Sequence, residues 1–302
     1  MSFNIRYATN ATDWNNRRAL VIGVIQTHAP DVVGLQEALR SQLNDMRTGL
    51  PGYGELGVGR DDGRTAGEYS AILYRTAAFA VDTSGTYWLS PTPEVPGSRA
   101  PGAGSIRINT WARLRHLATG RYFYFNSTHW DNVSASARLL GARLIADRIA
   151  ARPHRDPVIV ACDCNEIISQ EAVRYMLGAG GSPVALNSAY HKAHPADDPQ
   201  SATYHNFTGN TAGRPIDHVF YSDSLPVLSA SILRDRSGSQ YPSDHFPVLT
   251  TLRLGGPLPI GGFSRKKRNT TERVMAGDLG WGVYLEAGSR LRPDGRRAAP
   301  RN

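Results

Sequence analysis

The segment from Pro157 to Glu166, Pro-Val-Ile-Val-Ala-Cys-Asp-Cys-Asn-Glu, constrains the fold of this chain more than any other. Its apolar run from Val158 to Ala161 predicts a strand that is buried on both faces. This strand runs into Asp163 and Asn165, which point the same way because they lie two positions apart on an extended chain. Burying a carboxylate beside an amide costs several kcal/mol unless something pairs with them. Either the strand reaches the surface there, or partners from other segments hold the pair for a function, and we favour the second interpretation.

The two cysteines of the chain, Cys162 and Cys164, flank Asp163. On a strand both point away from Asp163, and their spacing is a poor arrangement for a disulfide. We therefore expect two small buried side chains without a bridge. A metal site at these thiols would need further soft ligands, so the sequence leaves the redox compartment open.

Length and charge predict one large domain followed by a tail. The chain has 302 residues, of which 40% are hydrophobic and 20% are charged. Of its 34 Lys/Arg and 26 Asp/Glu, ten and four lie from Gly255 onward, so most of the net charge of +8 is there. Residues 1–254 are expected to form a nearly neutral domain, in which composition indicates no basic nucleic-acid groove. Residues 255–302 are expected to form a flexible basic Gly/Arg-rich tail, with a short extended patch near Trp281 to Leu285, that either contacts acidic surfaces or is merely solvated.

The sequence shows neither a membrane span nor a leader. No apolar run is long enough to cross a bilayer. Met1 directly precedes Ser-Phe-Asn-Ile, which reads as a strand rather than a secretory signal. This favours a cytoplasmic protein, or a secreted one if the N-terminus is truncated or processed.

Hydrophobic periodicity predicts strands and helices along the whole domain. The clearest helix runs from Ser134 to Ala151, and an earlier one is capped by Asp13 and stopped by Pro30. Pro91 to Gly104 is rich in proline and glycine and reads as an exposed loop. Further helices are expected near Leu39–Leu50 and Glu171–Leu177, and strands at Ser2–Tyr7, Asp31–Leu35, Tyr69–Tyr74, Gly85–Leu89, Ile108–His116, Arg121–Ser127, Ile216–Tyr221, Val227–Leu233 and Phe246–Leu254.

Polar clusters terminate many of these strands. Each alone has a structural explanation as a turn residue, a helix start or a buried histidine. In sheets of this kind ligands gather beyond one end of the strands, so the conjunction predicts one site. Carboxylate and amide oxygens suit a hard cation such as Mg²⁺ or Mn²⁺, and no HExxH or CxxC motif indicates zinc. The clusters are Asn4, Glu37, His129 with Asp131, Asp163 with Asn165, and Asp217 with Asp244-His245.

Seven motifs in this order resemble the endonuclease/exonuclease/phosphatase superfamily, the metal-dependent phosphoesterases related to deoxyribonuclease I. The resemblance covers residues 1 to about 254 and implies an α+β fold, a four-layer α/β/β/α sandwich of two mixed β-sheets. The motifs are Ser2-Phe-Asn4-Ile-Arg6-Tyr7, Leu35-Gln36-Glu37, Gly67-Glu68-Tyr69-Ser70-Ala71-Ile72, Asn126-Ser-Thr-His129, Asp163-Cys-Asn165, Ile216-Asp217-His218 and Ser243-Asp244-His245-Phe246-Pro247-Val248.

The resemblance also implies roles by matching position. Glu37 would be the principal metal ligand, with Asn4 beside it and Asp244 helping. Asp163 would orient or deprotonate the attacking water, and Asn165 would hold that water or a phosphate oxygen.

Two histidines complete the implied set. His129 and His245 would donate to the phosphate. Glu68 would support His129 and Asp217 would support His245, each fixing a ring and favouring its charged form.

Some positions depart from the family pattern or fit it weakly. Cys162 and Cys164 stand where the family usually has glycine and a bulky apolar residue, which predicts altered packing. Trp130 either stacks on a base or caps a substrate near the mouth of the site, or else belongs to the core.

Three further residues are candidates for substrate binding. His205 and Asn206 lie in Thr203-Tyr-His205-Asn206-Phe207, which resembles a phosphate-side loop of part of the family. Arg107 follows a glycine-rich loop and either reaches a phosphate or forms a surface salt bridge.

The resemblance implies a Mg²⁺- or Mn²⁺-dependent hydrolase of phosphoester bonds, in which water attacks phosphorus in line. The substrate stays open between nucleic acid and smaller phosphoesters, sugar phosphates and lipid head groups included. The domain lacks the dense basic run of the DNA-repair members, and no apolar membrane-inserting hairpin is obvious. A non-catalytic binding module on the same fold is a further alternative, against which the presence of Glu37, Asp163 and His245 argues.

Overall fold

The structure, a computed structural model, describes residues 1–255, so the predicted tail and its extended patch lie outside the described residues. Within the described part no helix combines the length and apolarity needed to cross a membrane. The helices are α1 (Ala11–His28), α2 (Arg40–Gly49), α3 (Ala135–Ala151), α4 (Glu171–Met176) and α5 (Ala189–Ala193). The strands are β1 (Ser2–Asn4), β2 (Val32–Ala38), β3 (Tyr53–Leu56), β4 (Tyr69–Arg75), β5 (Phe79–Trp88), β6 (Ile108–His116), β7 (Tyr122–His129), β8 (Val158–Asp163), β9 (Asn187–Ser188), β10 (Asp217–Tyr221), β11 (Val227–Ile232) and β12 (Val248–Leu252).

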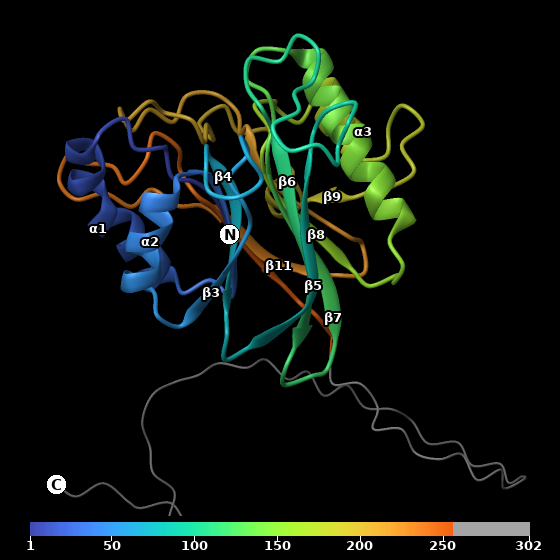
Figure 1. Cartoon of the computed structure of the whole chain (residues 1–302), viewed down its shortest axis with the longest axis horizontal. Coiled ribbons are helices and arrows are strands. Elements are labelled where there is room, and N and C mark those ends of the chain that lie inside the picture. Colours follow the sequence, from blue (N-terminus) through green and yellow to red (C-terminus); the bar gives the residue numbers. More distant parts are fainter. Residues whose placement is uncertain (256–302) are drawn as a thin grey trace, which may run out of the picture. The chain divides into compact units, whose positions relative to one another are not determined.

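These strands form two six-stranded mixed sheets that pack face to face (Figure 1). The first has the order β11-β12-β1-β2-β4-β3, and the second has the order β5-β6-β7-β8-β10-β9. Each sheet contains a central parallel pair, β1 with β2 and β7 with β8, whose carboxyl ends share one edge.

Helices cover the outer face of each sheet (Figure 1). On the first sheet, residues of α1 and α2 such as Val21 and Leu43 share one core with Phe3 and Leu35. On the second sheet, residues of α3 and α4 such as Ile145 pack against alternate residues of β7 and β8. The predicted α/β/β/α sandwich is confirmed by this arrangement.

The inner faces of the two sheets approach closely at their centres. Gly34 of β2 faces β8, and a Cβ atom at this position would lie 2.6 Å from the Cβ of Ala161. A larger residue would force the sheets apart, because real side chains do not tolerate such a separation. This contact brings the polar ends of β1, β2, β7 and β8 together.

Local details correct several expectations. The cap of α1 is Asn10 and not Asp13: the Asn10 side chain accepts a hydrogen bond from the Asp13 backbone N–H. Strand β5 begins at Phe79, six residues before the expected Gly85, because its N-terminal half pairs with β6. The edge strands β3 and β9 were not predicted.

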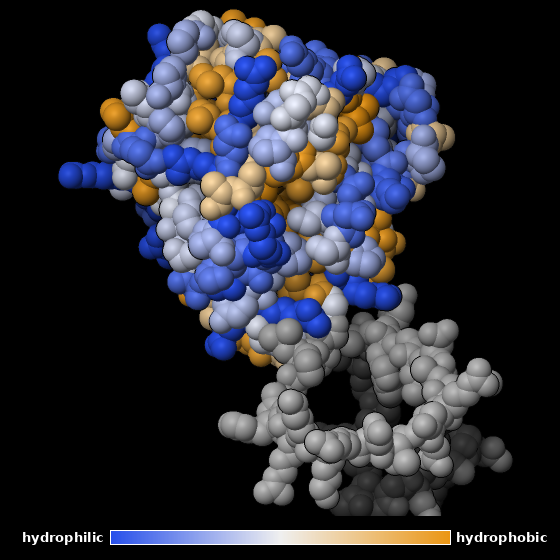
Figure 2. Space-filling model, turned by 90° about the vertical axis from the view of Figure 1, so that its right-hand side faces the viewer, coloured by the Kyte–Doolittle hydropathy of each residue, from blue (hydrophilic) through white to orange (hydrophobic). Residues whose placement is uncertain are grey.

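The face on the α3 side of the molecule carries hydrophobic residues in small groups separated by hydrophilic ones (Figure 2). Large apolar side chains that are well exposed in the described part include Val95, Val133 and Leu228.

Candidate active site

Three polar side chains form one row across neighbouring strands of the second sheet. Asp163, at the end of β8, is the direct register partner of His129 on β7 and of Asp217 on β10. Val160 and Cys162 pack into the outer core under α3, so alternation along β8 points Asp163 inward, between the sheets. The polar end of the strand is therefore buried and surrounded by partners, as predicted.

Asn4 reaches this row from the facing sheet. Its neighbour Phe3 packs outward with Ile5 against the helices, which leaves Asn4 directed between the sheets. The Asn4 Nδ2 donates to Asp163 Oδ2 at 2.8 Å and to Glu37 Oε1 at 3.0 Å. One buried amide thus connects carboxylates from both sheets.

Glu37 is directed to the site by an irregularity in β2. The register between β2 and β4 shifts between Leu35 and Ala38, and Glu37 has a left-handed φ of 61°. Regular alternation would turn Glu37 outward like Leu35, whereas a bulge re-aims the side chain. The Glu37 Oε2 also accepts a hydrogen bond from the Tyr7 N–H at 3.2 Å.

His245 lies in the loop before β12 and closes the site opposite His129. Its Nδ1 is 2.8 Å from Asp217 Oδ2, and its Nε2 is 3.8 Å from Asp163 Oδ2. Burial alone would lower the pKa of His245, but the charges of Asp217 and Asp163 outweigh it and raise the pKa to about 10. The expected contact between Asp217 and His245 is present, and the raised pKa favours the charged form of His245.

Asp163 lies at the centre of these contacts. Burial and the charge of Asp217 raise the pKa of Asp163 to about 7, against the opposing effects of His245 and the Asn4 hydrogen bond. A carboxyl group that titrates near neutral pH can exchange protons with water under working conditions.

His129 has the opposite electrostatic surroundings. Its Nε2 lies 3.3 Å from Asp163 Oδ2 and 3.1 Å from the Nδ2 of Asn165. Burial, followed by the charges of Arg107 and Arg60, lowers the pKa of His129 well below its usual value. This lowered pKa opposes the expected charged form of His129, while the ring does lie beside Asp163 and Asn165.

Glu68 does not contact His129 by a hydrogen bond in the described part of the chain. It accepts a hydrogen bond from Arg60 Nη1 at 2.6 Å instead. Burial raises the pKa of Glu68, with Arg60 opposing this effect. Glu68 and His129 line one small cavity with a volume of about 10 Å³. Glu68 is therefore close to His129, but it does not hold the ring by a hydrogen bond as expected.

Arg107 lines the same cavity and is neither a surface group nor free. Its side chain is buried, and its Nη2 donates to Asn132 Oδ1 at 3.0 Å. Its Nε is buried without a hydrogen-bond partner in the described structure, 3.9 Å from Asp131 Oδ2. The alternative of a surface salt bridge is therefore excluded.

Trp130 belongs to the core and not to the mouth of the site. It is fully buried among Cys164 and residues of α3 and α4, because it directly follows β7 and the continued alternation turns it to the face opposite His129. The role of stacking on a base is wrong for this residue. Its backbone carbonyl accepts a hydrogen bond from Asn165 Nδ2 at 3.1 Å, which holds the amide beside His129.

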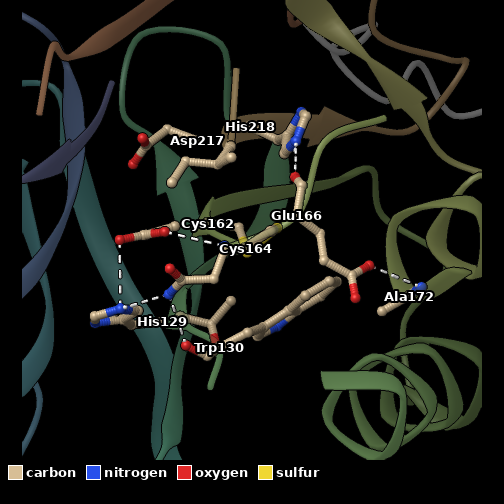
Figure 3. The surroundings of a disulfide bond; sticks show 12 residues. His129, Trp130, Cys162, Cys164, Glu166, Ala172, Asp217 and His218 are labelled. Atoms are coloured by element: carbon tan, nitrogen blue, oxygen red, sulfur yellow. Dashed lines mark hydrogen bonds and ion pairs between the residues drawn. A yellow bond between two sulfur atoms is a disulfide. The ribbon is translucent and has the colours of Figure 1, made fainter. Parts of the chain in front are cut away.

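The cysteines form a disulfide, which corrects the expectation of two separate thiols. The bridge joins Cys162 to Cys164, whose Cα atoms are 5.2 Å apart, and it lies between Trp130 and His218 (Figure 3). Straight-strand geometry misled the prediction because β8 ends at Asp163 and the chain turns there, with a left-handed φ of 48° at Asn165. The Asn165 N–H donates a hydrogen bond to Asp163 Oδ1 at 3.1 Å across this turn.

His205 and Asn206 act on the site through the backbone. Their N–H groups donate to the carbonyl of Asp244, at 2.8 and 3.2 Å. The His205 ring stacks on Phe246 with centroids 3.9 Å apart, and burial lowers its pKa to about 4. The Asn206 side chain is exposed. These two residues therefore hold the loop that carries Asp244 and His245.

Sequence reasoning missed three residues near the site. Arg6 lies against Glu37 and Asp244, Arg60 flanks His129, and the exposed Tyr204 ring has its centroid 5.1 Å from that of His245. Tyr204 and Arg6 belong to motifs that were recognised. Arg6 lies two positions after Asn4 and Tyr204 directly precedes His205, and this proximity is the signal that could have found them. No comparable signal marks Arg60.

The donor set at Glu37, Asn4 and Asp244 fits a hard divalent cation. All three carry oxygen donors, and Asp244 lies in the same loop as His245. Burial, and to a smaller extent the charge of Glu37, raise the pKa of Asp244, which means that this negative charge is incompletely compensated. A divalent cation would relieve the repulsion between these carboxylates.

A second group could also hold a cation. One ligand atom from each of Asp163, Asp217 and His245 lies within 4.8 Å of the others, and all three residues are buried. The raised pKa of His245 opposes this use, since a protonated imidazole cannot coordinate a metal.

The chain resembles known proteins over this whole region. The model of the endonuclease/exonuclease/phosphatase family matches residues 1–245. A structure of an endonuclease/exonuclease/phosphatase from Bacteroides vulgatus is 35% identical with a TM-score of 0.77, and the match covers 84% of this chain and 97% of that chain. The mannosyl-6-phosphatase of Bacteroides thetaiotaomicron is 33% identical with a TM-score of 0.75, over 83% of this chain and 98% of that one.

More distant structures share the fold. The TDP2 protein of D. rerio, solved with a single-strand DNA product, is 16% identical with a TM-score of 0.67, over 83% of this chain and 97% of that one. None of the curated proteins matches the sequence. The family match and the two Bacteroides structures show that this chain belongs to the endonuclease/exonuclease/phosphatase family.

Proposed function

We propose that the protein is a divalent-metal-dependent phosphoester hydrolase. The observation that carries the proposal is the position of Asp163, which contacts Asn4 of the facing sheet, His129 and His245 at one edge of the sandwich. Two sets of groups needed for hydrolysis meet there: oxygen donors for a hard cation, and proton-transfer groups.

Asp163, Asn165 and His245 would each have a separate role in the hydrolysis. Asp163, with a pKa of about 7, takes a proton from water as it attacks phosphorus in line with the leaving group. Asn165 holds the water or a phosphate oxygen. His245, kept protonated by Asp217, donates to the phosphoryl oxygen on which charge develops.

The other flank contributes donors of a different kind. Neutral His129 lies beside Asn165 on the side where we place the phosphate, and the buried guanidinium of Arg107 supplies positive charge behind it. A cation held by Glu37, Asn4 and Asp244, Mg²⁺ or Mn²⁺, would neutralise nonbridging phosphate oxygens when bound.

For the substrate we favour a small phosphomonoester, with a sugar phosphate first. The domain up to Leu254 is nearly neutral, and the mannosyl-6-phosphatase relative is 33% identical over nearly all of its own length. A nuclease is the second candidate. It is favoured by the arginines Arg60 and Arg107 on one side of the site and the exposed aromatic Tyr204 on the other.

A substrate panel with Mg²⁺, with Mn²⁺ and with EDTA tests this proposal. It contains mannose 6-phosphate, p-nitrophenyl phosphate, bis-p-nitrophenyl phosphate, plasmid DNA, RNA and sphingomyelin. We expect metal-dependent turnover that is highest with the monoesters and is lost in Asp163→Asn and His245→Ala. Activity that survives both substitutions would refute the site, and preferential cleavage of DNA would select the second candidate.

A further inference from the structure

The guanidinium of Arg6 lies between two carboxylates of the site. Its Nη1 is 3.6 Å from Glu37 Oε2 and its Nε is 3.8 Å from Asp244 Oδ2. Both separations exceed hydrogen-bonding distance, and in the described structure the guanidinium makes no side-chain hydrogen bond. The same group lies over the Tyr7 ring, 4.4 Å from its centroid. Arg6 is thus attracted electrostatically to Glu37 and Asp244 but makes no hydrogen bond to either carboxylate.

The backbone of Arg6, in contrast, is firmly held. Arg6 has a left-handed φ of 56°, which is unfavourable for a residue with a side chain. Its N–H donates to Asn4 Oδ1 at 2.9 Å, and its carbonyl accepts hydrogen bonds from Gln42 Nε2 at 3.0 Å and Arg17 Nη2 at 3.3 Å. These contacts fix where the Arg6 side chain starts, next to Asn4.

The Arg6 side chain is less enclosed than the carboxylates beside it. It is 32% exposed, whereas the side chain of Glu37 is 11% exposed and that of Asp244 is 6% exposed. The carboxylates are therefore enclosed in the site, whereas the guanidinium lies partly exposed at its mouth. Five N–H donors on a planar group also suit paired contacts with phosphate oxygens.

Glu37 and Asp244 are the same carboxylates that we assign to the divalent cation. Two cations that share this negative charge repel each other, so a metal there weakens the hold of the carboxylates on Arg6. The guanidinium, which starts next to Asn4, would then be available to a phosphoester that binds at the site.

We propose that Arg6 is a substrate-binding residue that neutralises Glu37 and Asp244 until a divalent cation binds them and then donates to the substrate phosphate. This inference rests on the proposed function, because it takes the metal position and the phosphate from there. It adds a binding order: the cation first, then the phosphoester.

Binding titrations of the full chain test the proposal without relying on turnover. We compare the wild type with Arg6→Gln, which removes the charge, and Arg6→Lys, which keeps the charge but removes the planar fork. Arg18→Gln is the matched control, because Arg18 is a half-exposed arginine of α1 that lies 3.8 Å from Asp45. Mn²⁺ binding is measured by calorimetry without phosphate, and inorganic phosphate binding is then measured at saturating Mn²⁺. Thermal melts verify that each variant is folded.

The expected pattern has opposite signs for the two ligands. Arg6→Gln should bind Mn²⁺ about 3- to 10-fold more tightly, because a competing charge is gone. The same variant should bind phosphate roughly 10- to 100-fold more weakly, because a charge-assisted hydrogen bond is lost. Arg6→Lys should bind Mn²⁺ like the wild type and phosphate at an intermediate affinity, and Arg18→Gln should change neither.

Unchanged or weaker Mn²⁺ binding by Arg6→Gln would overturn the shared-carboxylate model, and unchanged phosphate binding would overturn the substrate role. Failure of the proposed function is distinguishable, since it appears as wild-type protein that hydrolyses no phosphoester whatever the titrations show.

Discussion

The two histidines of the site, on opposite sides of Asp163, differ in the charge of their surroundings. His245 lies in the loop before β12 against Asp217, and its pKa is raised to about 10. His129 ends β7 beside Arg107 and Arg60, and its pKa is lowered well below its usual value. One imidazole is therefore a fixed cation at neutral pH and the other is a neutral group. The comparison teaches that residue type and strand-end position do not decide the protonation state of a site histidine, whereas the charged neighbours do.

The largest effect is expected at Asp163, which both histidines face. Asp163→Asn removes the group that accepts the proton of water, so kcat/KM should fall by about 10³-fold or more. The variant keeps the shape of the side chain, and its melting temperature should stay near that of the wild type. A residual rate within tenfold of the wild type would show that Asp163 does not act as a base.

The next largest effect is expected at His245. His245→Ala removes a charged donor to the phosphoryl oxygen and should lower kcat by about 10²- to 10³-fold. The buried His218, on the opposite face of the same sheet, provides the control. His218→Asn should reduce the thermal stability and leave kcat of the folded protein within a few-fold of the wild type. An equal loss of kcat in His245→Ala and His218→Asn would contradict the assignment of catalysis to the inner face of the sheet.

Asp217→Asn tests what sets the charge of His245. Burial lowers the pKa of His245, but the charge and hydrogen bond of Asp217, together with the charge of Asp163, outweigh it and raise the pKa from its ordinary value of 6.5 to about 10. Protonated His245 therefore persists through that window in the wild type. Without the carboxylate the pKa falls, and the alkaline limb of kcat/KM should move from near pH 10 toward neutral pH. Activity at pH 9 should drop about tenfold more than activity at pH 6. An alkaline limb that stays near pH 10 would show that Asp217 does not set the charge of His245, which is the basis of the comparison between the two histidines.

Arg60→Met tests the other flank, with a smaller expected effect. Removing this positive charge should raise the pKa of His129, which NMR of the ring protons follows directly. It also leaves Glu68 without its hydrogen-bond donor, so the Glu68 carboxyl should turn toward the cavity that it shares with His129. We expect a change of a few-fold in kcat/KM, and an unchanged or lower pKa of His129 would contradict the electrostatic explanation.

The smallest effect on activity is expected at the disulfide. The bridge encloses only Asp163, so it restricts the unfolded chain little. The double variant Cys162→Ala and Cys164→Ala should melt a few degrees lower, because both side chains are fully buried, and keep kcat within a few-fold. A loss of kcat as large as that of His245→Ala would show that the bridge positions Asp163.

Much of the fold could be predicted because its signals are local. The helix from Ala135 to Ala151 and the hairpin of β6 and β7 carry strong periodicity and turn residues. The cap of α1 was misplaced by three residues because Asn10 and Asp13 are both good N-cap residues. The edge strands β3 and β9 were missed because their stability comes from pairing with β4 and β10, which no local pattern encodes.

In the site, too, local signals were sufficient for some residues, whereas others depended on contacts distant in sequence. Strand ends predicted that Asn4, Glu37, His129, Asp163, Asp217 and His245 would meet. The same pattern left Trp130 open between the mouth of the site and the core, because the sequence does not show that the residue after β7 turns under α3. It assigned Glu68 to His129, because Arg60 carries no signal as the partner of Glu68.

By itself the sequence determined which chemical groups this protein can bring to a site and at which strand ends they stand, because polar residues after buried strands need partners wherever the chain goes. The tertiary structure alone decided how those groups are charged and connected. Burial, the bulge at Glu37, the bridge at Cys162 and Cys164, and the arginines beside His129 depend on segments that are distant in sequence. Electrostatic energies depend on distances through space, and sequence separation does not report them.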